Sequence, residues 1–129
     1  MLRLIVIALM LFLYLLLGIP VLLVEWVIGK YNKKAKDYSC LRMVQTAFKL
    51  MLKVAGVRLT VIGEEHVPKD QAVLYIGNHR SYFDILLTYS RCPRLTGYVA
   101  KVEMLRYWLL RDWMKALYCL FLDREDMKA

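Results

Sequence analysis

The sequence predicts an α/β fold attached to an N-terminal membrane helix, and three observations predict it. The first 29 residues contain an uninterrupted apolar run. A segment with helical periodicity follows, and after residue 57 the pattern changes to short apolar runs separated by turns. Because strand-like runs that alternate with helices are typical of α/β layers, we expect a small layered domain behind the membrane segment.

Residues 1–29 are predicted to form a transmembrane or membrane-embedded anchor. Leu4 to Val24 carry no charge, and a helix rising about 1.5 Å per residue over this length crosses a hydrocarbon core of roughly 30 Å. No Ala-x-Ala cleavage site follows the run, which favours an anchor over a cleaved signal peptide. The pattern leaves open whether the segment spans the bilayer or dips into one leaflet.

The positive charge is concentrated directly after this anchor. Residues 30–58 carry eight Lys and Arg against Asp37 alone, which accounts for +7 of the net charge of +8. Basic residues beside a membrane segment bind anionic headgroups and mark the cytoplasmic side. We therefore expect the protein at the cytoplasmic face of the cytoplasmic membrane, with membrane lipids as partners. We expect no nucleic acid, because the basic residues belong to no groove-reading module.

Residues 30–56 are interpreted as a basic linker followed by an amphipathic interfacial helix. Leu41 to Ala55 repeat apolar residues at helical spacing, and Gly56 suits the end of a helix. The opposite, polar face holds Arg42, Gln45, Thr46, Lys49 and Lys53. Such a helix either lies in the bilayer interface or packs its apolar face on its own domain.

Residues 57–129 supply the predicted layers. We expect strands at Val57–Ile62, Ala72–Ile76, Gly97–Ala100 and Tyr118–Leu122. We expect one helix at Ser81–Ser90, and one or two helices within Val102–Leu117. A polar loop, residues 63–71, separates the first two strands. The strands are therefore expected to alternate with helices.

The three cysteines predict neither a disulfide framework nor a zinc site. Cys40, Cys92 and Cys119 are far apart in the sequence and form no Cys-x-x-Cys pair. This usage agrees with a reducing, cytosolic environment. We expect the three thiols to serve as small buried hydrophobic groups.

One polar stretch, GNHRSYFDIL at residues 77–86, follows the second expected strand. His79 and Asp84 are five positions apart, so neither a regular helix nor a regular strand points them in the same direction. A turn that leads into a helix capped by Ser81 brings them together. The same Ser81-x-x-Asp84 spacing is a capping box. The pattern therefore leaves two alternatives, a catalytic pair or a loop histidine beside a capping acid.

A paired histidine would have a definite chemical use. A carboxylate fixes the imidazole tautomer and stabilises the imidazolium, while the other ring nitrogen takes a proton from a hydroxyl. Ser81 is better placed as the helix cap than as a nucleophile. The hydroxyl is therefore expected to come from a substrate.

These residues resemble a known family. Asn78 to Asp84 resembles the NHxxxxD motif of the glycerolipid acyltransferases, which include the 1-acylglycerol-3-phosphate acyltransferases. Three further segments are similar to family segments, in the same order: Gly63–Pro68 to GxExxP, Val99–Leu105 to AKxEL, and Leu120–Asp126 to a second motif in which an apolar strand ends in arginine. The resemblance covers about residues 57–129.

The family's third motif, with Glu-Gly-Thr-Arg, and its fourth motif have no counterpart in the sequence. In the family these motifs complete the acceptor pocket. We therefore interpret residues 57–129 as the N-terminal half of an acyltransferase domain, expected to be inactive alone, with a degenerate relative as the alternative.

The resemblance implies transfer of a fatty acyl group from acyl-CoA or acyl-carrier protein to the sn-2 hydroxyl of lysophosphatidic acid. By match to the motifs, His79 is the general base, Asp84 orients it, Arg124 binds the acceptor's phosphate and Lys101 is a second phosphate candidate. No metal or cofactor is implied, because the acyl donor is a substrate. From the residues alone, Arg124 could instead pair with a neighbouring carboxylate and Lys101 could be a solvated lysine.

Two other functions fit the same residues. A glycerolipid acyltransferase with this motif could use glycerol 3-phosphate or another lysophospholipid as acceptor. From a different class, the chain could be a non-catalytic relative that binds membranes and has lost the pocket. Acceptor profiling of the full-length form separates lysophosphatidic acid from the other acceptors. The mass of the native protein, or the coding sequence past residue 129, separates the enzyme from the binding module: a longer product with Glu-Gly-Thr-Arg would support the enzyme, and a stop codon after Ala129 the binding module.

Overall fold

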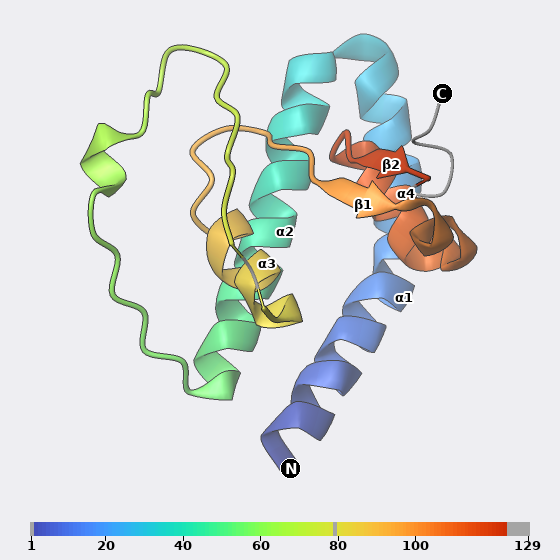
Figure 1. Ribbon diagram of the computed structural model, residues 1–129. Helices are drawn as coiled ribbons and strands as arrows, with labels where there is room; N and C mark the ends of the chain where they lie inside the picture. Colours follow the sequence, from blue (N-terminus) through green and yellow to red (C-terminus); the bar gives the residue numbers. More distant parts are fainter. Residues whose placement is uncertain (1, 79, 124–129) are drawn as a thin grey trace.

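The computed structural model of the chain describes residues 2–78 and 80–123 (Figure 1). Two long helices lie side by side, and α3, α4 and a small sheet lie against them. The elements, in order, are α1 (Leu2–Tyr31), α2 (Lys33–Ala55), the 3-10 helix η1 (Glu64–His66), α3 (Tyr82–Tyr89), β1 (Val99–Lys101), the 3-10 helix η2 (Val102–Arg106), α4 (Trp108–Ala116) and β2 (Leu120–Leu122). The described part of the chain is therefore mostly helical, with a short parallel sheet.

Helix α1 contains the predicted apolar segment and extends it in both directions. Among the described residues it is the one helix long and apolar enough to cross a membrane, judged by length and composition. Most of its large apolar side chains are exposed, Leu17 and Leu23 among them. Its two buried residues are Gly18 and Glu25, which face the rest of the molecule. One side of α1 is therefore available to lipid.

A short turn at Asn32 joins α1 to α2. The Asn32 side chain caps α2 by accepting a hydrogen bond from Ala35 N at 3.0 Å, so the helix begins at Lys33, eight residues before its predicted start. Ser39 Oγ then donates to Glu25 Oε1 at 2.5 Å, and Glu25 is only 4% exposed. This buried polar pair fixes the register between the two helices.

Helix α2 presents its apolar face to the chain itself. Leu41, Val44, Met51 and Leu52 are buried, and the face meets both α1 and α3. The apolar face of α2 therefore packs on α1 and α3. The helix ends as predicted at Gly56, whose positive φ of 74° is the left-handed conformation that suits glycine.

Helix α4 contacts α1 where the Trp113 side chain packs against Gly18. The Trp113 indole is 3% exposed and lies 5.1 Å, centroid to centroid, from the Tyr14 ring. A Cβ atom at Gly18 would lie 2.5 Å from Trp113 Nε1, so only glycine allows this contact without displacement of the indole. Trp113 belongs to a core that also contains Leu117 of the α4–β2 connection and Tyr89 of α3.

The sheet contains the two strands predicted after α3. Strand β1 pairs with β2 in parallel, with Val99 opposite Leu120 and Lys101 opposite Leu122. The chain passes from one strand to the other through η2 and α4, which occupy the region predicted to hold one or two helices. A parallel pair with a helical crossover is the basic unit of an α/β layer.

Two other predicted strands are wrong. Val57–Ile62 and Ala72–Ile76 run without strand pairing, and among the described residues β1 and β2 form the sheet. Figure 1 shows both segments in a long loop between α2 and α3, interrupted by η1. Their apolar composition suggested strands, but a strand also requires a hydrogen-bonding neighbour. Ile62 and Ile76 are accordingly 92% and 88% exposed.

The cysteines lead to a first testable prediction. All three thiols are free, and Cys40 is fully buried between α1 and α2, whereas Cys92 and Cys119 are half-buried. Burial raises the pKa of the Cys40 thiol to about 11, and the nearby Glu25 acts in the same direction. Because the thiolate is the nucleophile, we expect iodoacetamide to modify Cys40 slowest of the three at pH 8, as measured by mass spectrometry of peptides. Modification of Cys40 as fast as Cys92 would contradict this packing.

Candidate active site

The candidate site begins at the N-terminus of α3, where the polar stretch enters the helix. Ser81 has an extended backbone and is the N-cap, and its Oγ accepts a hydrogen bond from Phe83 N at 3.1 Å. The Asp84 carboxylate reaches back to the N-cap backbone. The predicted capping box is therefore confirmed.

The Asp84 carboxylate accepts hydrogen bonds from backbone N–H groups of the motif. Its Oδ2 accepts from Arg80 N at 2.7 Å and from Ser81 N at 2.9 Å. Asp84 thus holds the backbone immediately after residue 79, at the positive end of α3.

Two of the predicted site residues, His79 and Arg124, lie outside the described residues. The general-base role of the first and the phosphate-binding role of the second therefore stay predictions. The site was also expected at the end of a buried strand, but residues 72–76 form a loop. The motif is instead positioned by the helix that follows it.

Aromatic contacts hold α3 in place from its other end. Tyr89 is 1% exposed, with ring centroids 6.0 Å from Phe48 of α2 and 5.7 Å from Tyr98. The Thr88 and Tyr98 hydroxyls are hydrogen-bonded to each other. Since Tyr98 immediately precedes β1, these contacts connect the helix that bears Asp84 to the sheet that bears Lys101.

Lys101 is the exposed last residue of β1. It lies opposite Leu122, so parallel pairing brings it beside the end of β2, directly before Asp123. The second predicted motif continues from this strand end. The phosphate-binding role of Lys101 stays a prediction.

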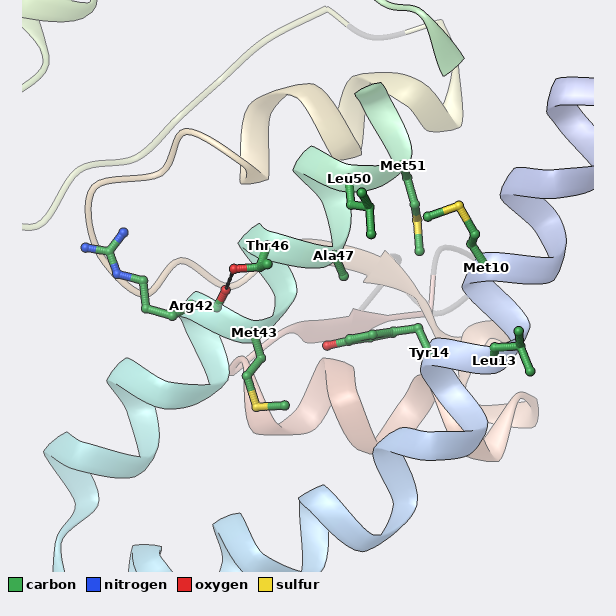
Figure 2. Close-up of a pocket in the computed structure, with 9 residues that line it drawn as sticks. All are labelled: Met10, Leu13, Tyr14, Arg42, Met43, Thr46, Ala47, Leu50 and Met51. Carbon is green, nitrogen blue, oxygen red and sulfur yellow. Dashed lines mark hydrogen bonds between the residues drawn. The ribbon is translucent and has the colours of Figure 1, made fainter. Parts of the chain in front are cut away.

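An apolar cavity lies away from these residues, between α1 and α2 (Figure 2). Its volume is about 540 Å³. Its lining is Met10, Leu13, Tyr14, Arg42, Met43, Thr46, Ala47, Leu50 and Met51, and includes no residue of the polar stretch. Figure 2 shows the Tyr14 ring pointing across the cavity towards α2. This lining suits hydrocarbon rather than the polar groups of a reaction.

The comparison with known families decides the family of the chain. Residues 58–129, more than half of the sequence, match the family model described as Acyltransferase. The chain belongs to the acyltransferase family. The match covers the capping box, Lys101 and both strands, so the resemblance inferred from the motifs is confirmed.

Two curated relatives of this acyltransferase chain carry the same name. One, from Mycoplasma pneumoniae, is named a probable 1-acyl-sn-glycerol-3-phosphate acyltransferase and is 33% identical over 84 residues, covering 61% of the chain and 31% of the relative. The other, the 1-acyl-sn-glycerol-3-phosphate acyltransferase of Borreliella burgdorferi, is 28% identical over 90 residues, or 67% of the chain and 35% of the relative. The chain spans about a third of the length of these relatives. No solved structure matches it significantly.

One polar residue of this acyltransferase chain has a place that the sequence did not predict. Helical spacing places Gln45 on the polar face of α2, yet it is only 4% exposed. Its Nε2 donates to Cys92 O at 2.7 Å and to Tyr89 O at 3.3 Å, so it satisfies carbonyls at the C-terminal end of α3. Helical periodicity could not reveal this contact, because the partner is 44 or more residues away in the sequence.

Proposed function

We propose that the chain is the N-terminal part of an enzyme that acylates the sn-2 hydroxyl of lysophosphatidic acid and so forms phosphatidic acid for phospholipid biosynthesis. The observation that carries the proposal is the Asp84 capping arrangement, within a segment that matches the acyltransferase family. The names of the two curated relatives support the choice of acceptor.

In the proposed reaction His79 takes the proton from the acceptor hydroxyl. The hydroxyl oxygen attacks the thioester carbonyl of acyl-CoA or acyl-carrier protein, the C–S bond breaks, and the thiol leaves with a proton as the new ester forms. Asp84 stabilises the imidazolium that forms during the attack. A carboxylate already fixed by two backbone N–H groups suits this role, since it needs little further ordering.

Phosphate recognition is assigned to Arg124, with Lys101 as a second contact. A planar guanidinium makes two charge-assisted bonds to a phosphate. Support for Lys101 comes from its exposed position beside the end of β2. We place the reaction at the cytoplasmic face of the membrane, because the basic segment follows the apolar helix.

A direct assay tests this function. The purified protein in detergent micelles is given lysophosphatidic acid with acyl-CoA or with acyl-carrier protein, in parallel with glycerol 3-phosphate as acceptor. From the complete product of the coding region we expect phosphatidic acid, detected by mass spectrometry, together with release of an equal amount of free thiol, whereas the chain of 129 residues is expected to be inactive alone. Because the chain spans about a third of its relatives, the assay is repeated with the complete product of the coding region.

The outcomes separate the alternatives. Product from glycerol 3-phosphate alone would replace the proposed acceptor. Binding to vesicles with no turnover by the complete product, with any donor or acceptor, would refute the enzyme and favour the membrane-binding relative.

A further inference from the structure

A polar pocket lies at the end of α3 opposite to the capping box. Its volume is about 220 Å³. It is lined by one face of α2, by η1 and by the turn after α3, with residues Arg42, Gln45, Lys49, Glu64, Ser90, Arg91, Cys92 and Pro93. Helix α3 separates this pocket from Asp84, since eight residues extend about 12 Å. The pocket is therefore distinct from the candidate active site.

On the α2 side, the pocket is lined by two cations, Arg42 and Lys49, and by the buried Gln45 amide between them. Arg42, Gln45 and Lys49 follow one another at i, i+3 and i+7, which places them on one face of the helix. Arg42 Nη1 donates to Gln45 Oε1 at 3.4 Å, and Figure 2 shows the guanidinium directed away from the apolar cavity. Both cations thus belong to the polar side of α2.

The opposite side contributes a third cation. Arg91 makes a two-point contact with Glu64, in which Nε lies 3.0 Å from Oε1 and Nη2 contacts Oε2. These bonds hold the pKa of Glu64 below its usual range. Glu64 therefore stays ionised, and among the lining residues it is the one carboxylate beside three cations.

The groups that would repel an anion here are already engaged. Helix C-termini carry partial negative charge on their last carbonyls. The carbonyls of Tyr89 and Cys92 accept from the Gln45 amide, and Ser90 Oγ donates to Leu87 O. Glu64 is itself held by Arg91, so the lining presents three cations against one paired carboxylate.

We propose that this pocket binds a phosphate group through Arg42, Lys49 and Arg91. Guanidinium forks match phosphate oxygens, and an ammonium adds a mobile point charge. Two sources carry the same chemistry, the headgroup of an anionic lipid and a free phosphate or phosphate ester. The proposal does not depend on acyl transfer, because it concerns binding at a site away from Asp84.

NMR spectroscopy of the ¹⁵N-labelled protein in zwitterionic detergent micelles tests the proposal. Inorganic phosphate is titrated in one arm, and phosphatidylglycerol is added to the micelles in the other. We expect the Gln45 side-chain amide and the Arg91 Nε–H resonances to shift in at least one arm. A shift with inorganic phosphate identifies a free-phosphate site, and a shift with the lipid alone identifies a headgroup site. No shift in either arm overturns the proposal.

Matched variants separate the pocket from general charge. Arg42→Ser with Lys49→Ser removes two cations of the pocket, and we expect the affinity to fall about tenfold or more. Lys34→Ser with Lys53→Ser removes the same charge from exposed positions of the same helix outside the pocket, and the affinity for inorganic phosphate should stay within about twofold. Equal losses in the two variants would overturn the proposal.

A third variant has the opposite expected sign. Glu64→Gln removes the carboxylate that occupies Arg91, so phosphate should bind several-fold more tightly. Because this variant gains affinity, misfolding cannot imitate the result. Unchanged or weaker binding would exclude Arg91 from the site.

Discussion

Replacement of His79 by alanine in the complete product of the coding region is expected to lower acyl transfer by about 100-fold or more, because the proposed general base is removed. Binding of the protein to vesicles should be unchanged, since the apolar helix and the basic segment are not altered. The measurement is the rate of phosphatidic acid formation beside a vesicle sedimentation assay. Activity within a few-fold of the original protein would remove His79 from the mechanism.

The two roles of Asp84 can be separated in the same assay. Asp84→Asn keeps an oxygen that accepts from the backbone N–H groups of residues 80 and 81, but it loses the charge that stabilises an imidazolium. Ser81→Ala is the matched control, because it removes a cap contact worth about 1 kcal/mol and leaves the carboxylate in place. We expect the first variant to lose kcat and the second to lose mainly stability. The reverse pattern would make Asp84 a capping residue only.

Gly97→Val is expected to have the largest effect on the fold. A Cβ atom at this position would lie 2.1 Å from Tyr118 O, and that backbone oxygen cannot yield as a flexible side chain can. We expect the free energy of unfolding to fall by about 3 kcal/mol or more, with loss of amide protection in β1 and β2. Thermal unfolding and hydrogen exchange measure both effects.

Gly77→Val provides the control for this prediction. A Cβ atom at Gly77 has no neighbour within 4 Å, so the same change of side chain should leave the unfolding temperature nearly unaltered. Equal destabilisation by the two substitutions would point to a general cost of losing glycine rather than to contact between the residue 97 and residue 118 backbones.

Local signals in the sequence predicted local structure well. The capping box at Ser81 and Asp84 and the helix stop at Gly56 depend on neighbours within four residues, and both are confirmed. The apolar face of α2 follows from periodicity in the same way. The start of that helix was placed too late, because the Asn32 cap was not recognised.

Features that depend on distant partners were not predictable from the pattern. The apolar runs at 57–62 and 72–76 have strand-like composition, but only a neighbouring strand could make them pair. Helical spacing places Gln45 on the polar face of α2, whereas its burial depends on distant carbonyls at the end of α3 and just beyond it. The motif resemblance identified the family, and the structure confirms the predicted capping role of Asp84. The variants described above test the catalytic roles of His79 and Asp84.

The short turn at Asn32 has a consequence for the order in which the chain folds. A single non-helical residue joins α1 to α2, so the loop entropy lost when the two helices pair is small. Structures rich in such local contacts form quickly. During synthesis the hairpin can therefore assemble as soon as residue 55 has left the ribosome, before His79 and Asp84 have left it. The polar stretch at residues 77–86 would then emerge beside a finished scaffold.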